Sequence, residues 1–166
     1  MSELQLLRAD HGPAVLAFEV ENRGYFRSFI SDRGDDYFEH FSDVHGRRLL
    51  EQEAGEGAYY VLVADDGSVL GRFNLIIHDD GVAELGYRVA ARAAGRGVAT
   101  AAVRDVCQLA AERHGLRRLR AATAHDNEAS QRVLLKAGFV PVGPADPNDV
   151  GGNPGTWHEL DLTAQT

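Results

Sequence analysis

Three short apolar segments joined by Asp-Gly turns constrain the fold of this chain more than any other feature. The segments are residues 59–63, 69–77 and 82–89, and the turns are Asp66-Gly67 and Asp80-Gly81. Glycine accepts positive φ values, so Asp-Gly pairs between apolar segments favour tight hairpins. The middle of the chain is therefore predicted to be an antiparallel meander of three strands.

Further helix and strand patterns lie on both sides of this meander. Apolar residues recur near helical spacing in four segments, which are residues 10–21, part of 35–53, 97–113 and 127–137. Four further strands are predicted at residues 4–8, 116–123, 139–142 and 156–162. This order predicts an α/β (α+β) fold, in which four helices flank a mixed, mostly antiparallel sheet of about seven strands. Residues 144–155 hold three prolines and three glycines and are predicted to form a loop.

Length and composition fit one domain without a membrane segment. With 166 residues and 44% apolar side chains, the chain is expected to form a single domain over residues 1–166. It contains no apolar run of about 18 residues, and Met1-Ser2-Glu3 does not begin a signal peptide. The lone cysteine, Cys107, cannot form an internal disulfide, which indicates a reducing compartment. We therefore expect a cytoplasmic protein with no membrane partner.

Charge is distributed unevenly along the chain. The formal net charge of −8 argues against a nucleic-acid partner, because phosphate backbones need a basic surface. Residues 1–66 hold 14 acidic and 6 basic side chains, whereas residues 67–166 hold 11 of each. Solvated helix faces account for such an imbalance. Alternatively, the first part attracts a cationic partner and the second part binds an anionic one.

A glycine-containing turn between a strand and a helix is the clearest candidate binding site. Gly95 and Gly97 open the helix, where unpaired amides and the helix dipole favour phosphate. Arg92 and Arg96 add positive charge nearby. The turn lacks the Gly-Lys-Ser/Thr of a P-loop and the third glycine of a dinucleotide fingerprint, which disfavours kinases and dehydrogenases. An ordinary strand-to-helix turn is the alternative interpretation.

Two motifs in the second half of the chain resemble those of one family. Arg92-x-x-Gly95-x-Gly97, followed by Val-Ala-Thr, resembles the Gln/Arg-x-x-Gly-x-Gly/Ala signature of the GCN5-related N-acetyltransferases (GNAT). Asn127-x-x-Ser130, with the Gly-Phe that ends the same helix, resembles the fourth-helix motif of the RimJ/RimL branch, the ribosomal-protein N-terminal acetyltransferases. The motifs stand in the order found in that family, and the resemblance covers nearly the whole chain.

The resemblance implies both the arrangement of the strands and the co-substrate. Family members splay two parallel strands and place acetyl-coenzyme A (acetyl-CoA) between them, with its pantetheine arm along the earlier strand. Here the strands would be residues 86–89 and 120–123, and the pyrophosphate would meet the amides of residues 95–100. The residues implied to bind acetyl-CoA are Tyr87, Arg88, Val89, Arg92, Gly95, Arg96, Gly97, Val98, Ala99, Thr100, Asn127 and Ser130.

Two residues are candidates for catalysis, Glu84 and Ser130. On its predicted strand Glu84 points opposite to Leu85 and Tyr87, and many relatives use a glutamate near this place as a base through water. Ser130 places a hydroxyl on an otherwise apolar helix face, where it would contact the coenzyme A sulfur. The alternatives are an exposed strand glutamate and a small residue that permits close helix packing. Asn127 fits both an N-cap and a contact with coenzyme A.

One departure from the family pattern affects the general acid. Many relatives place a tyrosine further along the helix that contains Ser130, where it protonates the departing thiolate. This chain has leucine at positions 134 and 135 and no tyrosine after Tyr87. Ser130 or water would therefore have to supply that proton.

Signals for the acceptor side are weaker. The candidate acceptor-binding residues are Glu21, Tyr25, Phe26, Phe29, Asn74 and Trp157. Each of them also fits a core or surface role. The seven histidines form no zinc-binding pattern, so no metal is expected. Cys107 lies in mid-helix without a partner histidine in evident register and is expected to be a core residue.

These observations predict an enzyme that transfers the acetyl group of acetyl-CoA to a primary amine by direct attack in a ternary complex. The acceptor is a protein N-terminal α-amine or a small-molecule amine, and the acidic first part of the chain favours a cationic one. A monomer or a homodimer is expected. A non-catalytic acyl-CoA-binding sensor or scaffold is the first alternative, and a nucleotide-binding protein is the second.

Overall fold

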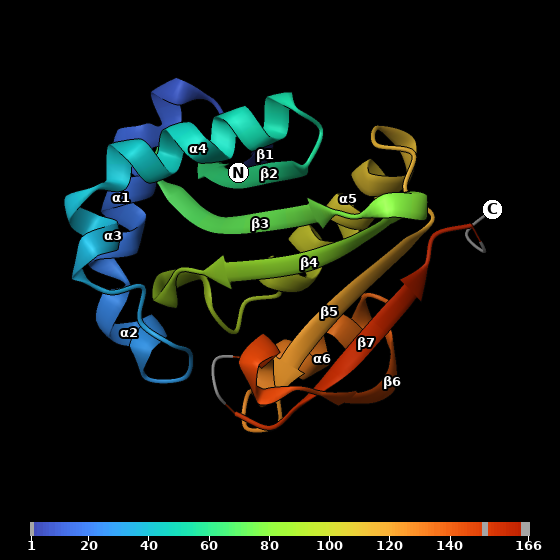
Figure 1. The fold of residues 1–166 in the computed structure, drawn as a ribbon. Coiled ribbons are helices and arrows are strands. Elements are labelled where there is room, and N and C mark those ends of the chain that lie inside the picture. Colours follow the sequence, from blue (N-terminus) through green and yellow to red (C-terminus); the bar gives the residue numbers. More distant parts are fainter. Residues whose placement is uncertain (1, 151–152, 164–166) are drawn as a thin grey trace.

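A seven-stranded sheet forms the centre of the computed structural model, which describes residues 2–150 and 153–163 (Figure 1). The strands are β1 (Ser2–Leu6), β2 (Gly57–Ala64), β3 (Val69–Ile77), β4 (Val82–Val89), β5 (Arg118–Ala124), β6 (Val140–Ala145) and β7 (Gly155–Asp161). They lie in the order β1-β2-β3-β4-β5-β7-β6, and every neighbouring pair is antiparallel except β4 and β5. The structure thus confirms the mixed sheet and the predicted meander.

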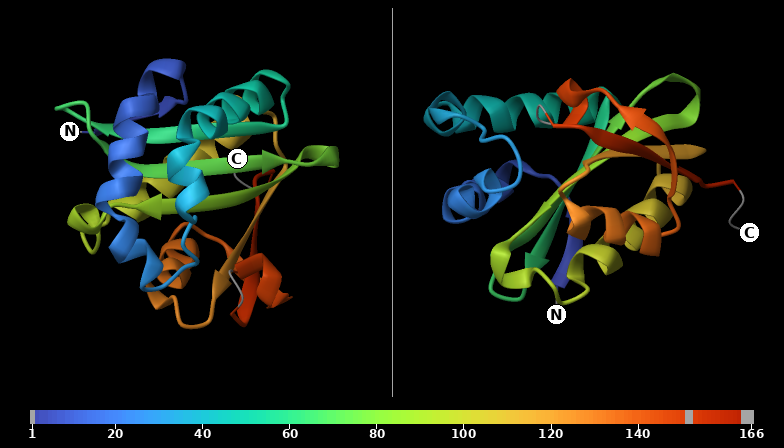
Figure 2. Two further views of the ribbon diagram at one scale, coloured as in Figure 1. Left: turned by 60° about the vertical axis from the view of Figure 1, so that its left-hand side comes forward. Right: turned by 90° about the horizontal axis from the view of Figure 1, so that it is seen from below.

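Within the described part of the chain, six α-helices pack on the two faces of this sheet (Figure 2). They are α1 (Gly12–Glu21), α2 (Arg23–Arg27), α3 (Asp35–Glu39), α4 (Phe41–Glu53), α5 (Val98–Glu112) and α6 (Glu128–Lys136). Helices α1 to α4 cover one face, and α5 and α6 cover the other, so two apolar cores form. In each core, the side chains that the strands present to that face pack against apolar residues of the covering helices. No helix among the described residues is long and apolar enough to cross a membrane.

The predicted number of four helices was too low for two local reasons. The segment 35–53 is divided at His40, whose φ of −113° and ψ of 29° interrupt the helix between α3 and α4. Helix α2 has only five residues, including Gly24, and is too short to produce a periodic pattern. The predicted loop 144–155 is shorter than expected, because β6 extends to Ala145 and a 3-10 turn follows at Pro147–Val150. Residues 151–152 of that loop lie outside the described part.

The parallel strands β4 and β5 pair over only three residues. Val82–Glu84 align with Arg118–Arg120, and from Ala121 onward β5 pairs only with β7. Figure 1 shows the ends of the two strands moving apart. In the part of the chain that the structure describes, their facing edges therefore present main-chain groups without a ladder partner, and an extended ligand can add there as a strand. This confirms the splay that the resemblance implied.

Buried polar contacts hold α1 against the sheet and against the turn before α5. Glu19 is 1% exposed, and its carboxylate accepts two hydrogen bonds from Arg33, at 2.9 and 3.0 Å, and one from Arg72, at 2.8 Å. At the end of α1, the Oδ1 atom of Asn22 accepts a hydrogen bond of 3.0 Å from the amide of Ala91. These contacts fix the segment that leads into the Gly95–Gly97 turn.

Glu19→Gln is expected to lower the free energy of unfolding by about 3 kcal/mol at pH 7, since it leaves buried arginines without their counter-charge. Burial raises the pKa of Glu19, but the hydrogen bonds and charges of Arg33 and Arg72 outweigh it, so the net pKa lies below its ordinary value of 4.5. The advantage of the wild type is therefore complete above pH 4.5 and is lost as pH falls through the folded-state pKa.

Urea unfolding of both proteins between pH 7 and pH 3 measures this difference. Asp10→Asn removes an exposed pair with Arg8 and is the control, with an expected change below about 1 kcal/mol. A stability difference for Glu19→Gln that stayed constant over the whole pH range would contradict the assignment.

Candidate active site

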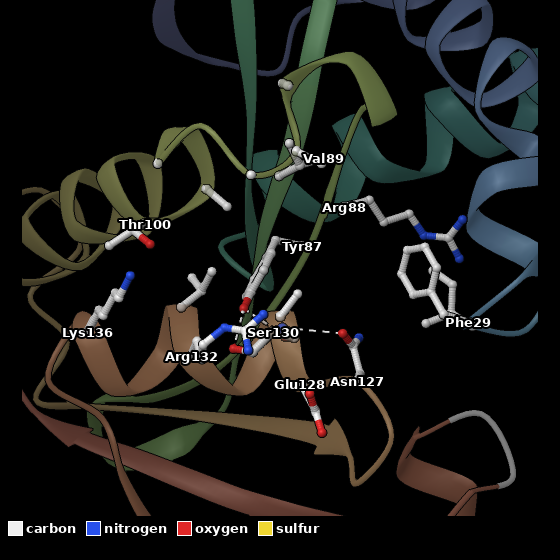
Figure 3. Close-up of a pocket in the computed structure, with 18 of the residues that line it drawn as sticks. Phe29, Tyr87, Arg88, Val89, Thr100, Asn127, Glu128, Ser130, Arg132 and Lys136 are labelled. Carbon is white, nitrogen blue, oxygen red and sulfur yellow. Dashed lines mark hydrogen bonds between the residues drawn. The ribbon is translucent and has the colours of Figure 1, made fainter.

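A cavity of about 530 Å³ lies beside the separated ends of β4 and β5 (Figure 3). Its walls come from the end of β4, the turn before α5, the segment from the end of β5 into α6, and the region of α2. The lining residues are Tyr25, Phe29, Ile30, Tyr87, Arg88, Val89, Ala93, Ala94, Gly95, Gly97, Ala99, Thr100, Asp126, Asn127, Glu128, Ala129, Ser130, Arg132, Val133 and Lys136. The cavity therefore brings together the two motifs identified in the sequence.

The turn before α5 offers unpaired amides to this cavity. Gly95 and Gly97 have φ values of +73° and +75°, which L side chains rarely adopt, and a Cβ atom on either would meet nothing within 4 Å. The amide of Ala101 donates to the carbonyl of Gly97 at 3.1 Å and begins the hydrogen bonding of α5. Among the described residues, the amides of residues 95–100 find no acceptor in the preceding turn. Such a helix start attracts phosphate.

The two arginines of the turn point away from this cavity. Arg92 donates a hydrogen bond of 2.7 Å to the Oγ atom of Ser68, and Arg96 donates to the carbonyl of Arg92 at 3.0 Å. Both arginines line a separate hollow of about 630 Å³ beside the β2–β3 turn. Arg92 and Arg96 were predicted to lie beside the pyrophosphate, but their side chains face this other surface. Val98 also lines the separate hollow.

Two cations of α6 that the sequence reasoning missed line the cavity instead. Arg132 and Lys136 lie four residues apart, so they share one side of the helix. In Figure 3 Lys136 points toward Thr100 in the first turn of α5. The helical spacing of Ala129, Arg132, Val133 and Lys136 was the signal that could have identified them.

The hydroxyl groups of Tyr87 and Ser130 form a pair inside the cavity (Figure 3). Their oxygen atoms are 2.8 Å apart, and the Tyr87 hydroxyl also lies 3.2 Å from the carbonyl oxygen of Ser130. Burial raises the pKa of Tyr87 to about 12, so its hydroxyl stays protonated at neutral pH. When Tyr87 donates to the Ser130 hydroxyl, the hydrogen of Ser130 is free to point into the cavity.

Asn127 begins helix α6 and also lines the cavity. Its Oδ1 atom accepts a hydrogen bond of 3.2 Å from the amide of Ser130, which confirms the predicted N-cap. The cap orients the first turn of α6 and with it the Ser130 hydroxyl.

Glu84 lies at the point where β4 and β5 separate, outside the residues that line the cavity. It is the last residue of β4 that pairs with β5, opposite Arg120. Leu85 and Tyr87 pack in or against the core under α5 and α6, so strand alternation turns Glu84 to the other face, as predicted. Its carboxylate is 34% exposed and lies 2.5 Å from the Nε2 atom of His78.

The acceptor candidates fall into two groups. Tyr25 and Phe29 line the cavity and contact each other edge to face at 5.1 Å. Phe26 is 2% exposed and belongs to the core under α1, and Glu21 is exposed at the end of that helix, so neither lines the cavity.

The remaining two candidates, Asn74 and Trp157, lie on the sheet. Asn74 pairs with Gly86, and its Oδ1 atom is buried without a hydrogen-bond partner among the described residues. Trp157 packs under the guanidinium group of Arg120, which lies 4.3 Å from the ring centre. Neither residue lines the cavity.

A lone cysteine and one cluster of possible metal ligands lie outside the cavity. Cys107 is buried in the core, and burial raises the pKa of its thiol to about 12, which confirms the expected core role. Among the described residues, the possible ligand atoms of Asp36, Glu39 and His40 lie within 4.8 Å of one another. All three are exposed, and exposed acidic groups commonly gather without a metal.

A family model described as an acetyltransferase (GNAT) domain matches residues 4–140. The chain belongs to the GNAT acetyltransferase family. A probable N-acetyltransferase of Bacillus subtilis, YjcK, is 32% identical in an alignment 160 residues long, which covers 90% of this chain and 84% of YjcK. The present chain is thus an N-acetyltransferase, and its acetyl donor is acetyl-CoA.

Two solved structures illustrate the same GNAT fold. The ribosomal-protein-S5-alanine acetyltransferase of Vibrio fischeri has a TM-score of 0.89 and 18% identity, over 99% of this chain and 95% of its own. RimJ of Mycobacterium smegmatis, in complex with CoA-disulfide, has a TM-score of 0.86 and 20% identity, over 99% of this chain and 83% of its own. These similarities support the RimJ/RimL resemblance at the level of the fold.

The GNAT cavity fits coenzyme A by its own chemistry. Open space beside Gly95 and Gly97 and the unbonded amides after them suit a diphosphate. The unpaired edge of β4 suits an amide-containing arm, which can bond to main-chain groups as a strand would. The hydroxyl of Ser130 lies in the same cavity, as a sulfur partner would have to.

Proposed function

We propose that this acetyltransferase catalyses direct attack of a primary amine on acetyl-CoA in a ternary complex. The amine is a protein N-terminal α-amine or belongs to a small molecule. The observation that carries the proposal is the separation of β4 and β5 beside one cavity, which opens to the unbonded amides of residues 95–100 and to the Tyr87–Ser130 pair. Residues 1–166 act as a single domain in this proposal.

The residues assigned to coenzyme binding divide by chemistry. The amides of residues 95–100 and the Thr100 hydroxyl hold the diphosphate, and Arg132 and Lys136 neutralise phosphate charge. The main chain of residues 87–89 bonds to the amides of the pantetheine arm. Asn127 adds its side-chain amide from the other wall of the cavity.

Ser130 and Tyr87 manage the proton at the leaving group. The acetyl donor supplies a thioester, whose sulfur leaves as a thiolate and needs a hydrogen-bond donor. Ser130 donates to that sulfur, and Tyr87 orients Ser130 by donating to its hydroxyl. This pair takes the place of the helix tyrosine that this chain lacks.

The class of the acceptor, the oligomeric state and the cellular location also belong to this proposal. The Vibrio fischeri enzyme is named as an acetyltransferase of an alanine of ribosomal protein S5, which supports an N-terminal amine as one candidate. The excess of acidic residues in 1–66 supports a cationic acceptor, whereas the arginines beside the cavity support an anionic acceptor. We propose that the protein is a monomer or a homodimer. The single cysteine supports a location in the cytoplasm.

The test of the proposed function is release of free coenzyme A thiol from acetyl-CoA by the purified protein with a panel of amines. Turnover that depends on the amine is expected. Tight binding of coenzyme A without turnover of any amine would favour the sensor alternative. Tighter binding of ATP than of coenzyme A would favour the nucleotide-binding alternative.

Glu84→Gln is expected to lower kcat/KM about tenfold near pH 6.5, because the proposed base acts through water on an ammonium acceptor. The loss is expected to shrink at high pH, where the acceptor amine is already neutral. Rates between pH 6 and pH 10 measure this profile. Glu159→Gln is the matched control. Glu159 lies on β7 with its side chain 27% exposed, and its carboxylate lies beside Arg120 of β5. An equal loss at every pH, or an equal loss in the control, would contradict a base role for Glu84.

A further inference from the structure

One buried carboxylate faces three guanidinium groups beside the cavity. Glu19 accepts hydrogen bonds from Arg33 and Arg72, which together occupy both of its oxygen atoms. Arg88 on β4 lies directly opposite Arg72 on β3, and the Nη1 atom of Arg88 is 3.5 Å from the carboxylate of Glu19. That separation is at the limit of a hydrogen bond, so Glu19 is satisfied without Arg88. The group of four side chains carries two positive charges in excess.

Arg88 is the member of this group that borders the cavity (Figure 3). Its side chain is 19% exposed and lines the cavity together with Tyr25 and Phe29. In the figure it extends away from Tyr87 and Ser130 and ends beside Phe29. Its guanidinium carbon lies 5.1 Å from the ring centre of Phe26. A charged, planar group with aromatic neighbours therefore stands at the end of the cavity far from the Ser130 hydroxyl.

The positive charge of Arg88 is only partly balanced by neighbouring negative charge. Burial, and after it the positive charges of Arg33 and Arg72, lower the pKa of Arg88, and with all its neighbours taken together that pKa is about 10. Glu19 and Tyr37 act in the opposite direction and only partly compensate. A guanidinium group that is desolvated and shares one carboxylate with two other arginines gains from a second carboxylate.

We propose that the end of the cavity formed by Arg88, Tyr25 and Phe29 binds an anionic group, a carboxylate carried by the amine acceptor itself. This inference rests on the proposed function and names its substrate class. The carboxylate belongs to a free amino acid or to an acidic side chain near the N-terminus of a peptide. Planar bidentate bonding by Arg88 suits a carboxylate, and the aromatic side chains exclude water around it. The arginines next to the cavity, rather than the acidic exposed helices, set the charge preference.

Matched pairs of amines test this inference. The first arm compares free amino acids with their carboxamides, and the second compares amidated peptides with Asp or Asn at position two. The wild type is expected to prefer the carboxylate member of at least one arm by about tenfold in kcat/KM, mainly through KM. The arm that shows the preference identifies the source of the carboxylate.

Arg88→Gln is expected to remove this preference and to change the calorimetric affinity for coenzyme A less than about twofold, because the coenzyme arm uses the main chain of β4. Arg88→Lys is expected to keep part of the preference. Arg118→Gln, at the opposite end of the sheet and 52% exposed, is the control and should match the wild type. Melting temperatures of all variants identify any loss of folding.

The outcomes separate this inference from the proposed function. Turnover of neutral or cationic amines as fast as carboxylates, or a preference that survives Arg88→Gln, would overturn the inference alone. If no amine is turned over, calorimetry of N-acetylamino acids and of their carboxamides with coenzyme A-saturated protein tests the inference instead. Equal affinities for the two kinds of ligand would overturn the inference. Absence of coenzyme A binding would overturn the proposed function and the inference together.

Discussion

Gly97→Glu is expected to raise the dissociation constant for coenzyme A by about 100-fold or more, because juxtaposed like charges cost several kcal/mol and each 1.4 kcal/mol is tenfold. Gly97 lines the cavity, and a Cβ atom there meets nothing within 4 Å, so a side chain would enter the space proposed for the diphosphate. Isothermal titration calorimetry with coenzyme A measures the change.

Gly115→Glu provides a matched control for backbone strain. Gly115 has a φ of +62°, its Cβ direction is equally open, and it lies outside the cavity. Both variants are expected to lose similar thermal stability, since both force a side chain into a left-handed conformation. Only Gly97→Glu is expected to lose coenzyme A. Equal affinity in the two variants would show that the turn does not bind the diphosphate.

Ser130→Ala is expected to lower kcat by about 100-fold, the low end of the range for a positioned proton donor. Its affinity for coenzyme A should change less than about threefold, because one neutral hydrogen bond contributes little net free energy. Stopped assays of thiol release and calorimetry measure the two quantities separately. A large loss of affinity with unchanged kcat would make Ser130 a binding residue only.

Two companion variants examine the pair. Tyr87→Phe removes the hydroxyl that lies 2.8 Å from that of Ser130 and is expected to have a smaller effect on kcat, because the Ser130 donor remains. Ser130→Thr keeps a hydroxyl and is expected to retain more activity than Ser130→Ala. Because burial raises the pKa of Tyr87 to about 12, its ionisation should leave no step in the rate below pH 11.

Features encoded by local sequence were predictable. The bounds of β3 and β4 were predicted as the structure has them, because Asp-Gly turns and alternating apolar residues act over a few positions. The glycines of the turn and the N-cap of α6 were also readable, since positive φ values and caps depend on individual residue types. The division of α3 from α4 at His40 left no such local mark.

Features that depend on tertiary packing were not predictable from the same patterns. Arg92 stands in a phosphate motif but bonds to Ser68, which the β2–β3 turn brings beside it from 24 residues away. Tyr87 and Ser130 are 43 residues apart, and only the packing of α6 against β4 brings their hydroxyl groups together. The excess of arginines around Glu19 likewise joins α1, β3, β4 and a loop.

The central claim is that coenzyme A lies in the gap between β4 and β5 with its diphosphate on the turn before α5. A crystal structure of the protein with coenzyme A tests it most directly. The expected result is diphosphate oxygen atoms within hydrogen-bond distance of the amides of residues 95–100 and a pantetheine arm bonded to the main chain of residues 87–89. Coenzyme A in the hollow beside Arg92 and Arg96, with the β4–β5 gap empty, would contradict the claim.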